Sequence, residues 1–483
     1  MLQKMSQQQK ALKLVKKNDV ISELPDEIIS QLISLLPFRE AVRTSILSKS
    51  WISRWTTHTD IVCDATNILG FSASEFGGLD NLGRQYYRNL FVEHVDSVMQ
   101  KRSKGPKINS FVIDFALTQE HKSHITSWIT GAIMMGVETI NLNLRGWSLF
   151  AALDGSLGQE WYTFPLSVLA SLGQACTVKH LQLDSCSLRS LSISKSLASL
   201  VTVKLLHVNF TDQQLDLMLS NCLFLERLIV ESCPFFVNFR LTNRNSRLKF
   251  LAIKSCCRLK DIELYANNLE ILQCTGRIKH LLLKHVPQLA EVFFNIAGSS
   301  GRARRVTHAP SRFANDVPRL ESLNIVLMNC SSLPEGVTSL INIKHLVLTV
   351  LPFQDKDMLS WLTYILKAAP LLTNLQLNQF HSRLSRRSEP DDILLPEVTH
   401  VNLTKLEING YQGEEHEKVL LKYLVDSAVK LDLLVISPRM KLYSGLNDWR
   451  YINSNTSDNR VSSEQLQELH SIVPKAVRVK YCD

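Results

Sequence analysis

The apolar residues between positions 19 and 58 recur with the spacing of an α-helix rather than a strand. A wide apolar stripe of this kind is typical of a helix that buries one face. Its members are Ile28, Ile29, Leu32, Ile33, Leu35 and Leu36. Pro25 suits a first helical turn, and Pro37 ends the pattern because proline cannot continue a helix. The pattern predicts further short helices over residues 40 to 47 and from Ser48, whose hydroxyl can cap the helix.

These short helices carry more apolar surface than so small a segment can bury by itself. Isolated helices of this length are unstable in water, so their apolar stripes must pack against another surface. The excess is concentrated in five large side chains, Leu36, Ile46, Leu47, Trp51 and Trp55. We therefore predict that this segment binds another polypeptide through these residues.

A different pattern begins near residue 176, where L-x-x-L-x-L, with other aliphatic residues replacing some leucines, recurs eleven times up to residue 437. The middle positions of the first five copies, from Leu181 to Leu272, are separated by 22, 25, 23 and 21 residues. Leucine-rich repeats have periods of about 20 to 29 residues, so a solenoid of parallel strands with helices or loops on its outer face is predicted. Later spacings include one of 9 and one of 42 residues, which indicates insertions or half-repeats.

Cysteines and histidines repeat in phase with this pattern. Cys186, Cys233 and Cys256 each lie five residues beyond the middle leucine of their copy. A small side chain at that position can satisfy the backbone of the turn that leaves the strand. The histidines of a recurring tetrapeptide, aliphatic-Lys-His-Leu, are His180, His280 and His345. Their shared position favours a structural or surface-binding role over that of a catalytic base.

Residues 61 to 175 alternate only weakly between apolar and polar positions. Residues 111 to 115 and 139 to 144 are predicted strands, and a helix is predicted between them near residues 125 to 135. We interpret this region as diverged first repeats.

The repeats also predict a surface. Side chains alternate along a strand, so a repeat that buries its leucines presents the intervening residues on the opposite face. That face is predicted to carry His180, Gln182, Asp184, Arg227, Glu231, Lys254, Gln273, His280, Lys284, Asn324, His345, Asn374, Gln376, Asn378, Lys405 and Glu407. Such a mixed concave surface suits recognition of a protein client better than of a nucleic-acid duplex, which requires net positive potential.

The charge of the chain is partly local. Its 483 residues are 45% hydrophobic and 20% charged, as in packed proteins, and the formal net charge is +9. Five of these positive charges lie in a polar leader over residues 1 to 18, and the remainder has a net charge of +4. They are Lys4, Lys10, Lys13, Lys16 and Lys17. A dense phosphate-binding surface is therefore not predicted.

The ten cysteines form no C-x-x-C pair or other zinc-site spacing. We interpret them as small buried hydrophobic residues in a reducing compartment, and expect the protein in the cytoplasm, the nucleus or both. The leader lacks the apolar core of a signal peptide, and no run of about 18 apolar residues predicts a membrane span.

Motifs of catalysis are also missing from the sequence. It contains no H-E-x-x-H, no G-x-S-x-G, no Walker loop and no glycine-rich dinucleotide turn. We therefore expect a non-catalytic protein without a cofactor or metal. Segments 298 to 315 and 381 to 396 are predicted loops, being rich in Gly, Ser, Arg and Pro without periodicity. The arginines around Thr307 are interpreted as a solvated insertion rather than a phosphate-binding or regulatory site: Arg302, Arg304, Arg305 and Arg312.

Residues 19 to 55, DVISELPDEIISQLISLLPFREAVRTSILSKSWISRW, strongly resemble the plant F-box module. The matching positions include Leu24, Pro25, Ile28, Leu36, Pro37, Val42, Leu47, Ser48, Lys49, Trp51 and Trp55. The resemblance implies that these residues contact a Skp-type adaptor and, through it, a cullin-based ubiquitin ligase. The family usually has basic residues beside Trp51, where this chain has Ser50 and Ile52.

Residues 398 to 437 resemble the FBD segment that follows the repeats in plant F-box/LRR proteins. The matching positions are Leu406, Ile408, Gly410, Gly413, Glu417, Tyr423, Leu424 and Ala428. The segment predicts a strand, a glycine turn, an amphipathic helix and a strand, which together cap the open edge of the repeats. The implied α/β architecture is a leader (1–18), an F-box (19–60), diverged repeats (61–175), leucine-rich repeats (176–397), an FBD-like cap (398–470) and a tail (471–483).

These features favour a substrate receptor of an SCF-type ubiquitin ligase, with the F-box on a Skp-type adaptor and the repeat face on a protein client. The runner-up is a recognition scaffold uncoupled from the ligase, suggested by Ser50 and Ile52. A nucleic-acid-binding repeat protein is the third hypothesis. Recognition assisted by a small molecule stays open, because some F-box repeat proteins resemble hormone receptors, but no residue in this sequence indicates a pocket.

Overall fold

The computed structural model of the chain describes residues 24–46, 51, 54–102, 107–145, 161–172, 175–188, 197–242, 247–276, 278–297, 317–328, 340–351, 363–380, 399–452 and 463–482. The chain divides into two compact units, Met1–Leu200 and Val201–Asp483. The predicted leader, both predicted loops and the adaptor-binding candidates Leu47, Ser48 and Lys49 lie outside the described residues.

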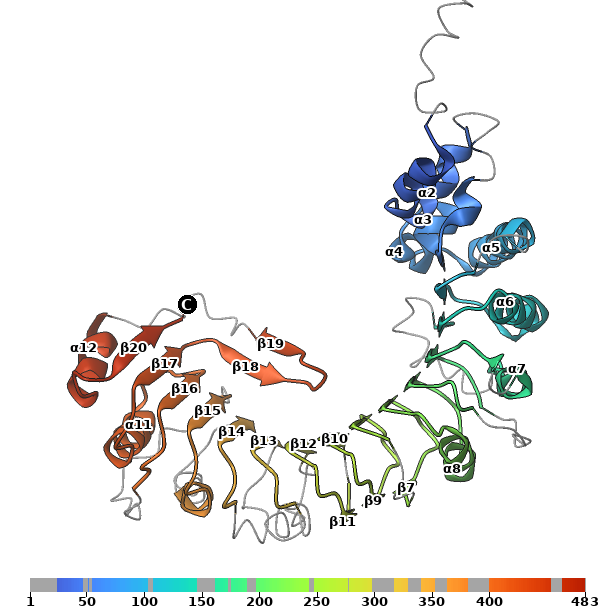
Figure 1. The fold of residues 1–483 in the computed structure, drawn as a ribbon. Coiled ribbons are helices and arrows are strands. Elements are labelled where there is room, and N and C mark those ends of the chain that lie inside the picture. The colour runs from blue at the N-terminus through green and yellow to red at the C-terminus, as the bar shows by residue number, and fades with distance from the viewer. Residues whose placement is uncertain are drawn as a thin grey trace, which may run out of the picture. The chain divides into compact units, whose positions relative to one another are not determined.

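The first unit begins with the F-box-like helices (Figure 1). Helix α2 (Asp26–Ser34) follows Pro25, and α3 (Phe38–Arg43) follows Pro37, so each proline precedes a first helical turn. The predicted second helix is shorter than expected, because α3 changes at Thr44 into the 3-10 helix η2 (Thr44–Ile46). A further 3-10 helix, η4 (Arg54–Thr57), packs beside α2.

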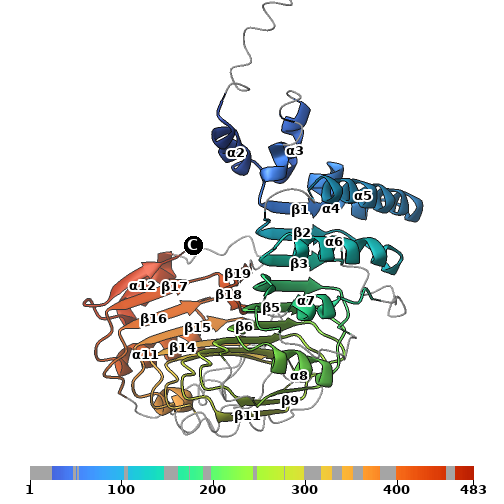
Figure 2. The same cartoon turned by 45° about the vertical axis from the view of Figure 1, so that its right-hand side comes forward.

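Strands and helices alternate through the rest of the first unit (Figure 2). Four parallel strands pair in chain order: β1 (Asp60–Asp64), β2 (Ser110–Asp114), β3 (Thr139–Asn143) and β4 (His180–Asp184). The intervening elements are η5 (Ala65–Leu69), α4 (Ala73–Gly77), α5 (Asn81–Arg102), η6 (Gln119–His121), α6 (Lys122–Met134) and α7 (Leu166–Leu172). The two strands and the helix predicted for this weakly periodic region are therefore confirmed.

The F-box-like helices are fixed to the first repeat within this unit. The backbone N–H of Arg39 donates to Asn67 Oδ1 (3.2 Å). Arg102, buried at the end of α5, donates from Nη2 to the carbonyl oxygen of His58 (3.0 Å). Gly70 has φ +90° and passes against the Arg39 guanidinium, where a larger side chain would collide.

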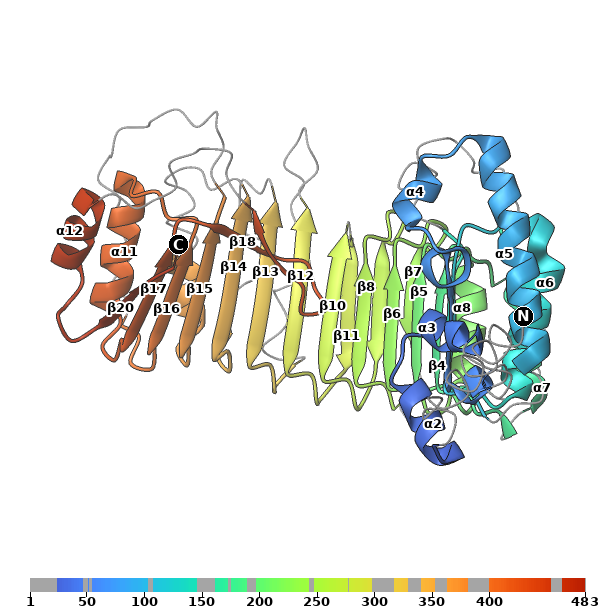
Figure 3. The ribbon, with the colours of Figure 1, turned by 90° about the horizontal axis from the view of Figure 1, so that it is seen from above.

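The second unit carries the remaining repeats on one parallel sheet, seen from above in Figure 3. Its strands, in spatial order, are β5 (Thr202–Leu206), β6 (Arg227–Glu231), β8 (Phe250–Lys254), β10 (Ile271–Gly276), β12 (Glu291–Ala297), β13 (Ser322–Met328), β14 (His345–Leu351), β15 (Asn374–Gln379), β16 (Lys405–Asn409), β17 (Leu433–Ser437) and β20 (Arg478–Tyr481). A second sheet is formed by β7 (Asn238–Leu241), β9 (Asp261–Tyr265) and β11 (His280–His285), in the order β11-β9-β7. Alternate aliphatic residues of the main sheet are buried, as in Val203 and Leu205 of β5.

The second sheet explains the two irregular spacings in the sequence. The copies at Leu272 and Leu281 lie only nine residues apart because they belong to different sheets, to β10 and β11 respectively. The true successor of Leu272 in the main sheet is Val292 of β12, which then pairs with Leu323. The spacings in the main sheet are thus 20 residues from Leu272 to Val292 and 31 residues from Val292 to Leu323. The expected half-repeat at Leu281 is strand β11 of the second sheet.

In the described part of the second unit, helices α8 (Asp212–Asn221), α11 (Glu415–Ser427) and α12 (Ser463–Ile472) lie on the outer side, and residues 363–368 are also helical. The predicted cap is confirmed in its order of strand β16, glycine turn, helix α11 and strand β17, with Gly410 and Gly413 at φ +82° and +79°. The segment predicted as a tail contributes β20, which pairs with β17. An unpredicted hairpin, β18 (Met440–Tyr443) with β19 (Trp449–Ile452), lies between them in sequence.

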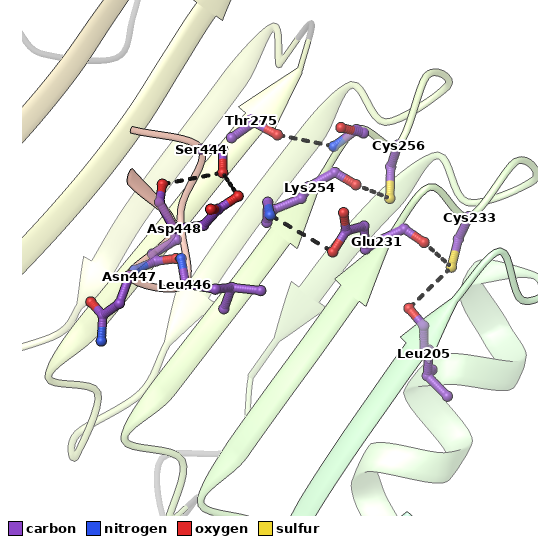
Figure 4. Close-up of polar contacts among 12 residues, drawn as sticks. Leu205, Glu231, Cys233, Lys254, Cys256, Thr275, Ser444, Leu446, Asn447 and Asp448 are labelled. Atoms are coloured by element: carbon purple, nitrogen blue, oxygen red, sulfur yellow. Dashed lines mark hydrogen bonds and ion pairs between the residues drawn. The ribbon is translucent and has the colours of Figure 1, made fainter. Parts of the chain in front are cut away.

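The three cysteines that repeat in phase with the leucines lie in the turns that leave the strands, as predicted. Each of the three in-phase thiols donates to a backbone oxygen two residues earlier, at 3.3 to 3.5 Å. The pairs are Cys186 with Asp184, Cys233 with Glu231 and Cys256 with Lys254. The intervening serines have positive φ: Ser185 (58°), Ser232 (55°) and Ser255 (53°). Figure 4 shows two of these turns. The thiol therefore accompanies a tight left-handed turn that leaves the strand.

Candidate functional site

The F-box-like segment exposes large apolar side chains. Ile29 and Ile33 are buried on one side of α2, while Ile28 and Leu32, each one residue earlier, lie about 100° away around the helix and remain exposed. The exposed set, here called the F-box apolar patch, is Ile28, Leu32, Leu35, Leu36 and Ile46. Leu35 and Ile46 are 81% and 87% exposed, far more than isolated folding would favour. The patch is therefore available to another polypeptide.

The two tryptophans behave differently from the prediction. Trp51 and Trp55 are only 5% and 4% exposed, so the expectation that they are left over for a partner is wrong. Trp55 packs edge-on against Phe38, with ring centroids 6.1 Å apart. The two tryptophans form part of the hydrophobic core of this small domain, because a segment of about forty residues contains few other large apolar side chains.

The remaining adaptor-binding candidates occupy intermediate or exposed positions. Leu24 and Val42 are half-buried, whereas Pro25 and Pro37 are exposed at the starts of α2 and α3. Leu32 and Leu35 were not singled out as adaptor contacts from the sequence. Their spacing from Ile28, four and seven residues, places all three on one side of a helix, and that signal was present in the sequence.

Polar contacts fix the geometry of this segment. Asp26, in the first turn of α2, pairs with Arg54 (Oδ1 to Nη2, 2.6 Å), and this hydrogen bond lowers the pKa of Asp26. The Asp60 N–H donates to His58 Nδ1 (3.2 Å), so Nε2 carries the proton and donates to the Leu36 carbonyl oxygen (3.0 Å). The chain that carries Leu36 is thus held in place from behind while its side chain faces outward.

Two of the predicted client-binding residues lie outside the main parallel sheet. His180, Gln182 and Asp184 lie on β4 of the first unit. His280 and Lys284 lie on β11 of the second sheet, so the prediction that they share the main surface is wrong. The main sheet of the second unit carries the rest of the group: Arg227, Glu231, Lys254, Gln273, Asn324, His345, Asn374, Gln376, Asn378, Lys405 and Glu407.

The hairpin β18–β19 covers part of this main sheet (Figures 1 and 3). Gln273 of β10 donates from Nε2 to the Tyr443 hydroxyl oxygen (3.2 Å) and accepts from the Leu446 N–H at Oε1 (2.7 Å). Lys441 donates to Glu407 Oε1 on β16 (2.9 Å). Strands from β10 to β16 thus hold one hairpin, and Gln273 is only 2% exposed.

The contact between hairpin and sheet is largely apolar. Tyr443 packs edge-on against Phe293, with centroids 4.7 Å apart, in a cluster that includes Val326. Leu446 packs on a second cluster on the same sheet. That cluster is Ile229, Phe250, Ala252 and Ile271. The strand face predicted to be polar therefore has an apolar centre, and the chain covers it with its own residues.

The hairpin tip adopts a conformation that the sheet supports. Gly445, Leu446 and Asn447 have successive φ values of +88°, +56° and +62°. A β-carbon on Gly445 would lie 3.1 Å from Gln273 Oε1 and 3.3 Å from the Phe293 ring. Figure 4 shows Leu446 over the strands that carry Glu231 and Lys254. Left-handed leucine is strained, so the Gln273 hydrogen bond to its N–H stabilises this tip.

A buried polar ladder continues beside the hairpin across β14, β15 and β16. Asn378 donates to Thr349 Oγ1 (2.9 Å), and Asn409 donates to Asn378 Oδ1 (2.9 Å). Burial alone would raise the pKa of Glu407, but hydrogen bonds from Asn409 and Lys441 hold it below its usual value. Asn378 and Glu407, predicted as client-binding residues, are therefore occupied within the chain.

The open part of the predicted face lies at the first positions of the strands. His345 is exposed, and the Asn374 amide nitrogen lies 2.9 Å from its Nδ1. Arg227 stacks its guanidinium 3.6 Å from the centre of the Phe250 ring. These groups, unlike Asn378, keep exposed surface that a partner can contact.

The described residues contain no candidate metal centre. No group of three or more His, Cys, Asp or Glu side chains among them is placed to hold a metal ion. Burial raises the pKa of Cys222 to about 12, which keeps this thiol protonated and unreactive. In the part of the chain that the structure describes, no helix has the length and apolarity needed to cross a bilayer.

Comparison with known proteins gives the same two parts. Residues 21–60 match the F-box domain, and residues 98–475 match the LRR domain of At1g61320/AtMIF1. The FBD-associated F-box protein At4g10400 of Arabidopsis thaliana is 24% identical over 436 residues, covering 89% of this chain and 95% of that protein. The F-box/FBD/LRR-repeat protein At5g56420 of the same plant is 21% identical over 439 residues, covering 88% and 93%.

Proposed function

This chain belongs to the plant F-box/FBD/LRR-repeat family, and we propose that it is the substrate receptor of an SCF-type ubiquitin ligase. In this role the F-box binds a Skp-type adaptor, the adaptor binds a cullin, and the repeats hold a protein client for ubiquitin transfer by other subunits. The chain itself is a non-catalytic adaptor. We propose that it acts in the cytoplasm, the nucleus or both.

The observation that carries this proposal is the F-box apolar patch. Its side chains are large, apolar and exposed, although the same small domain buries Trp51, Trp55 and Phe38. A stable protein rarely leaves such residues uncovered unless they bind a partner. Interface affinity is concentrated in a few central residues, and the most exposed members, Leu35 and Ile46, are the best candidates for that centre.

Adaptor binding by matched variants tests this assignment. The full chain is co-expressed with a Skp-type adaptor and cullin, as wild type, as Leu35→Ala/Ile46→Ala and as Leu82→Ala. Leu82 on α5 is 81% exposed, equal to Leu35, and lies outside the patch, so it controls for the loss of an exposed leucine. We expect the double variant to lose about 2 kcal/mol of adaptor binding, or roughly 30-fold in Kd, while Leu82→Ala binds as wild type.

Two outcomes count against the proposal. Failure of the wild-type chain to co-purify with the adaptor favours a recognition scaffold without a ligase. Unchanged binding by the double variant removes the patch as the interface. Trp51→Ala does not serve here, because Trp51 is buried and its loss would disrupt the domain itself.

A further inference from the structure

The hairpin β18–β19 is held as a fixed platform. A two-stranded hairpin alone is marginally stable in water. Here Tyr443 and Leu446 pack on apolar clusters of the main sheet, and Gln273 hydrogen-bonds both of them. The sheet therefore fixes β18, and β18 in turn fixes the position of β19.

Strand β19 presents an exposed aromatic surface. All four of its residues are exposed, and Trp449, Tyr451 and Ile452 are large and apolar. Lys441 holds its ammonium 4.7 Å from the Trp449 ring centre and 6.0 Å from that of Tyr451. Tryptophan and tyrosine contribute most to affinity where protein interfaces form, because they bury much surface with few rotatable bonds.

The backbone of β19 is open on its outer edge. The backbone N–H of Ser444 donates to the Asp448 carbonyl oxygen (2.9 Å), so these two residues form a hydrogen-bonded pair. Along an antiparallel ladder, such pairs alternate with pairs whose backbone groups point away from the partner strand. The register pairs Tyr443 with Trp449, so the backbone groups of Trp449 and Tyr451 point away from β18. None of the described residues pairs with this edge, which has neither a proline nor a bulge to block another strand.

The charge of the hairpin indicates which strand would fit. Arg439, Lys441 and Arg450 outnumber Asp448 over residues 438 to 452, giving a net charge of +2. Arg450 pairs with Asp448 within the hairpin (2.8 Å), and Lys441 pairs with Glu407 of the main sheet (2.9 Å). The hairpin together with Glu407 therefore keeps a net charge of +1. Side chains alternate along β19, so Trp449 and Tyr451 lie on one face and Arg450 on the other. A complementary strand alternates apolar residues with acidic ones.

We propose that an extended client segment of alternating acidic and apolar residues adds to β19 as a third strand. Main-chain hydrogen bonds to Trp449 and Tyr451 provide affinity, and their rings and the Arg450 guanidinium select the side chains. That the segment belongs to a client rests on the proposed function. The sheet predicted to bind the client instead supports the hairpin that does so.

Peptide binding to the full chain tests this inference. The probes are a fluorescent peptide of about eight residues that alternates Glu and Val, and a matched Lys and Val peptide. We expect the acidic peptide to bind at least about tenfold more tightly and to slow hydrogen exchange at the Trp449 and Tyr451 amides. Tyr451→Pro removes one outward N–H but no hydrogen bond to β18, since proline is tolerated on an edge strand. It should weaken binding at least about tenfold beyond Tyr451→Val, which keeps the N–H.

Three results would overturn the inference: equal binding of the two peptides, no binding up to about 1 mM, or equal binding by Tyr451→Pro and Tyr451→Val. Melting temperatures of both variants show whether the fold is kept, and the exchange experiment on the wild type decides the matter if the proline variant unfolds. Adaptor binding is measured on the same preparations. A chain that binds the adaptor but not the peptide contradicts the strand addition alone.

Discussion

The F-box and the main sheet of the second unit are both candidates for protein binding, yet they treat apolar surface in opposite ways. The F-box buries its tryptophans and leaves Leu35 and Ile46 exposed. The main sheet has an apolar centre as well, around Phe250 and Phe293, but the chain covers it with the hairpin. Surplus apolar residues in a sequence therefore identify a surface that must be covered, without telling whether a partner or the same chain covers it.

The largest effect on stability is expected inside the F-box. Its buried side chains should contribute to folding, whereas its exposed apolar side chains should contribute to binding. Trp55→Ala should reduce the free energy of unfolding of this region by about 3 to 5 kcal/mol, because it removes the ring packed against Phe38 and leaves a cavity. Hydrogen exchange of the α2 and α3 amides at increasing urea concentration measures this loss of free energy. Leu35→Ala, at an exposed position, should change stability by less than about 0.5 kcal/mol. Equal losses in both variants would contradict the division between interior and patch.

The next effect tests whether the sheet and the hairpin tip are one packed structure. Gly445→Ala should destabilise the docked hairpin by about 1 to 2 kcal/mol, since φ +88° strains alanine and its β-carbon crowds Gln273. Exchange of the β18 amides with solvent should become faster, whereas α2 amides stay unchanged. Gly77→Ala is the control, because a β-carbon there would meet no other atom within 4 Å.

A smaller effect on stability tests the hydrogen bonds between the hairpin and the main sheet. Tyr443→Phe keeps the ring against Phe293 but deletes the hydroxyl that Gln273 and the Asn447 N–H both contact. We expect a loss of about 1 kcal/mol in the free energy of unfolding of the second unit. Thermal melting measures this loss. An unchanged stability would mean that packing alone holds the hairpin.

The weakest effect is a pH dependence confined to the second unit. His400 is buried, no residue of the described chain hydrogen-bonds its ring nitrogens, and burial lowers its pKa from 6.5. The folded chain thus keeps this ring neutral while the unfolded chain protonates it. Stability should be full above about pH 6.5 and fall as the pH drops below it, until the folded-state pKa is reached. His400→Leu should flatten this slope, as measured by urea denaturation at about pH 7.5 and 5.5.

Periodicity and motif spacing predicted most of the fold. The eleven repeat copies are strands, and the cap between Leu406 and Ile436 has the predicted order, because both depend on local patterns of burial and turn residues. Several features were not predicted, among them strands β12 and β20, the second sheet and the hairpin. The copy at Leu281 satisfies the repeat pattern but pairs in another sheet, and pairing between distant residues leaves no local signal.

The hairpin was missed for a similar reason. Its contacts join Gln273 to Tyr443 and Leu446, about 170 residues away in sequence. The Phe250, Ala252 and Phe293 positions did carry a signal, because apolar residues at the nominally exposed positions of a repeat require a cover. In the F-box, the apolar stripe was recognised correctly, but helical spacing alone did not separate the buried tryptophans from exposed Leu35.

Hydrogen exchange of the full chain, alone and with a Skp-type adaptor, tests the contrast between these two regions most directly. The account predicts that amides of α2 and η2 exchange more slowly once the adaptor is bound, because the F-box apolar patch becomes covered. Amides of β18 should already exchange slowly in the free chain and show no change. Fast exchange of β18 in the free chain, or no protection of the F-box by the adaptor, would contradict it.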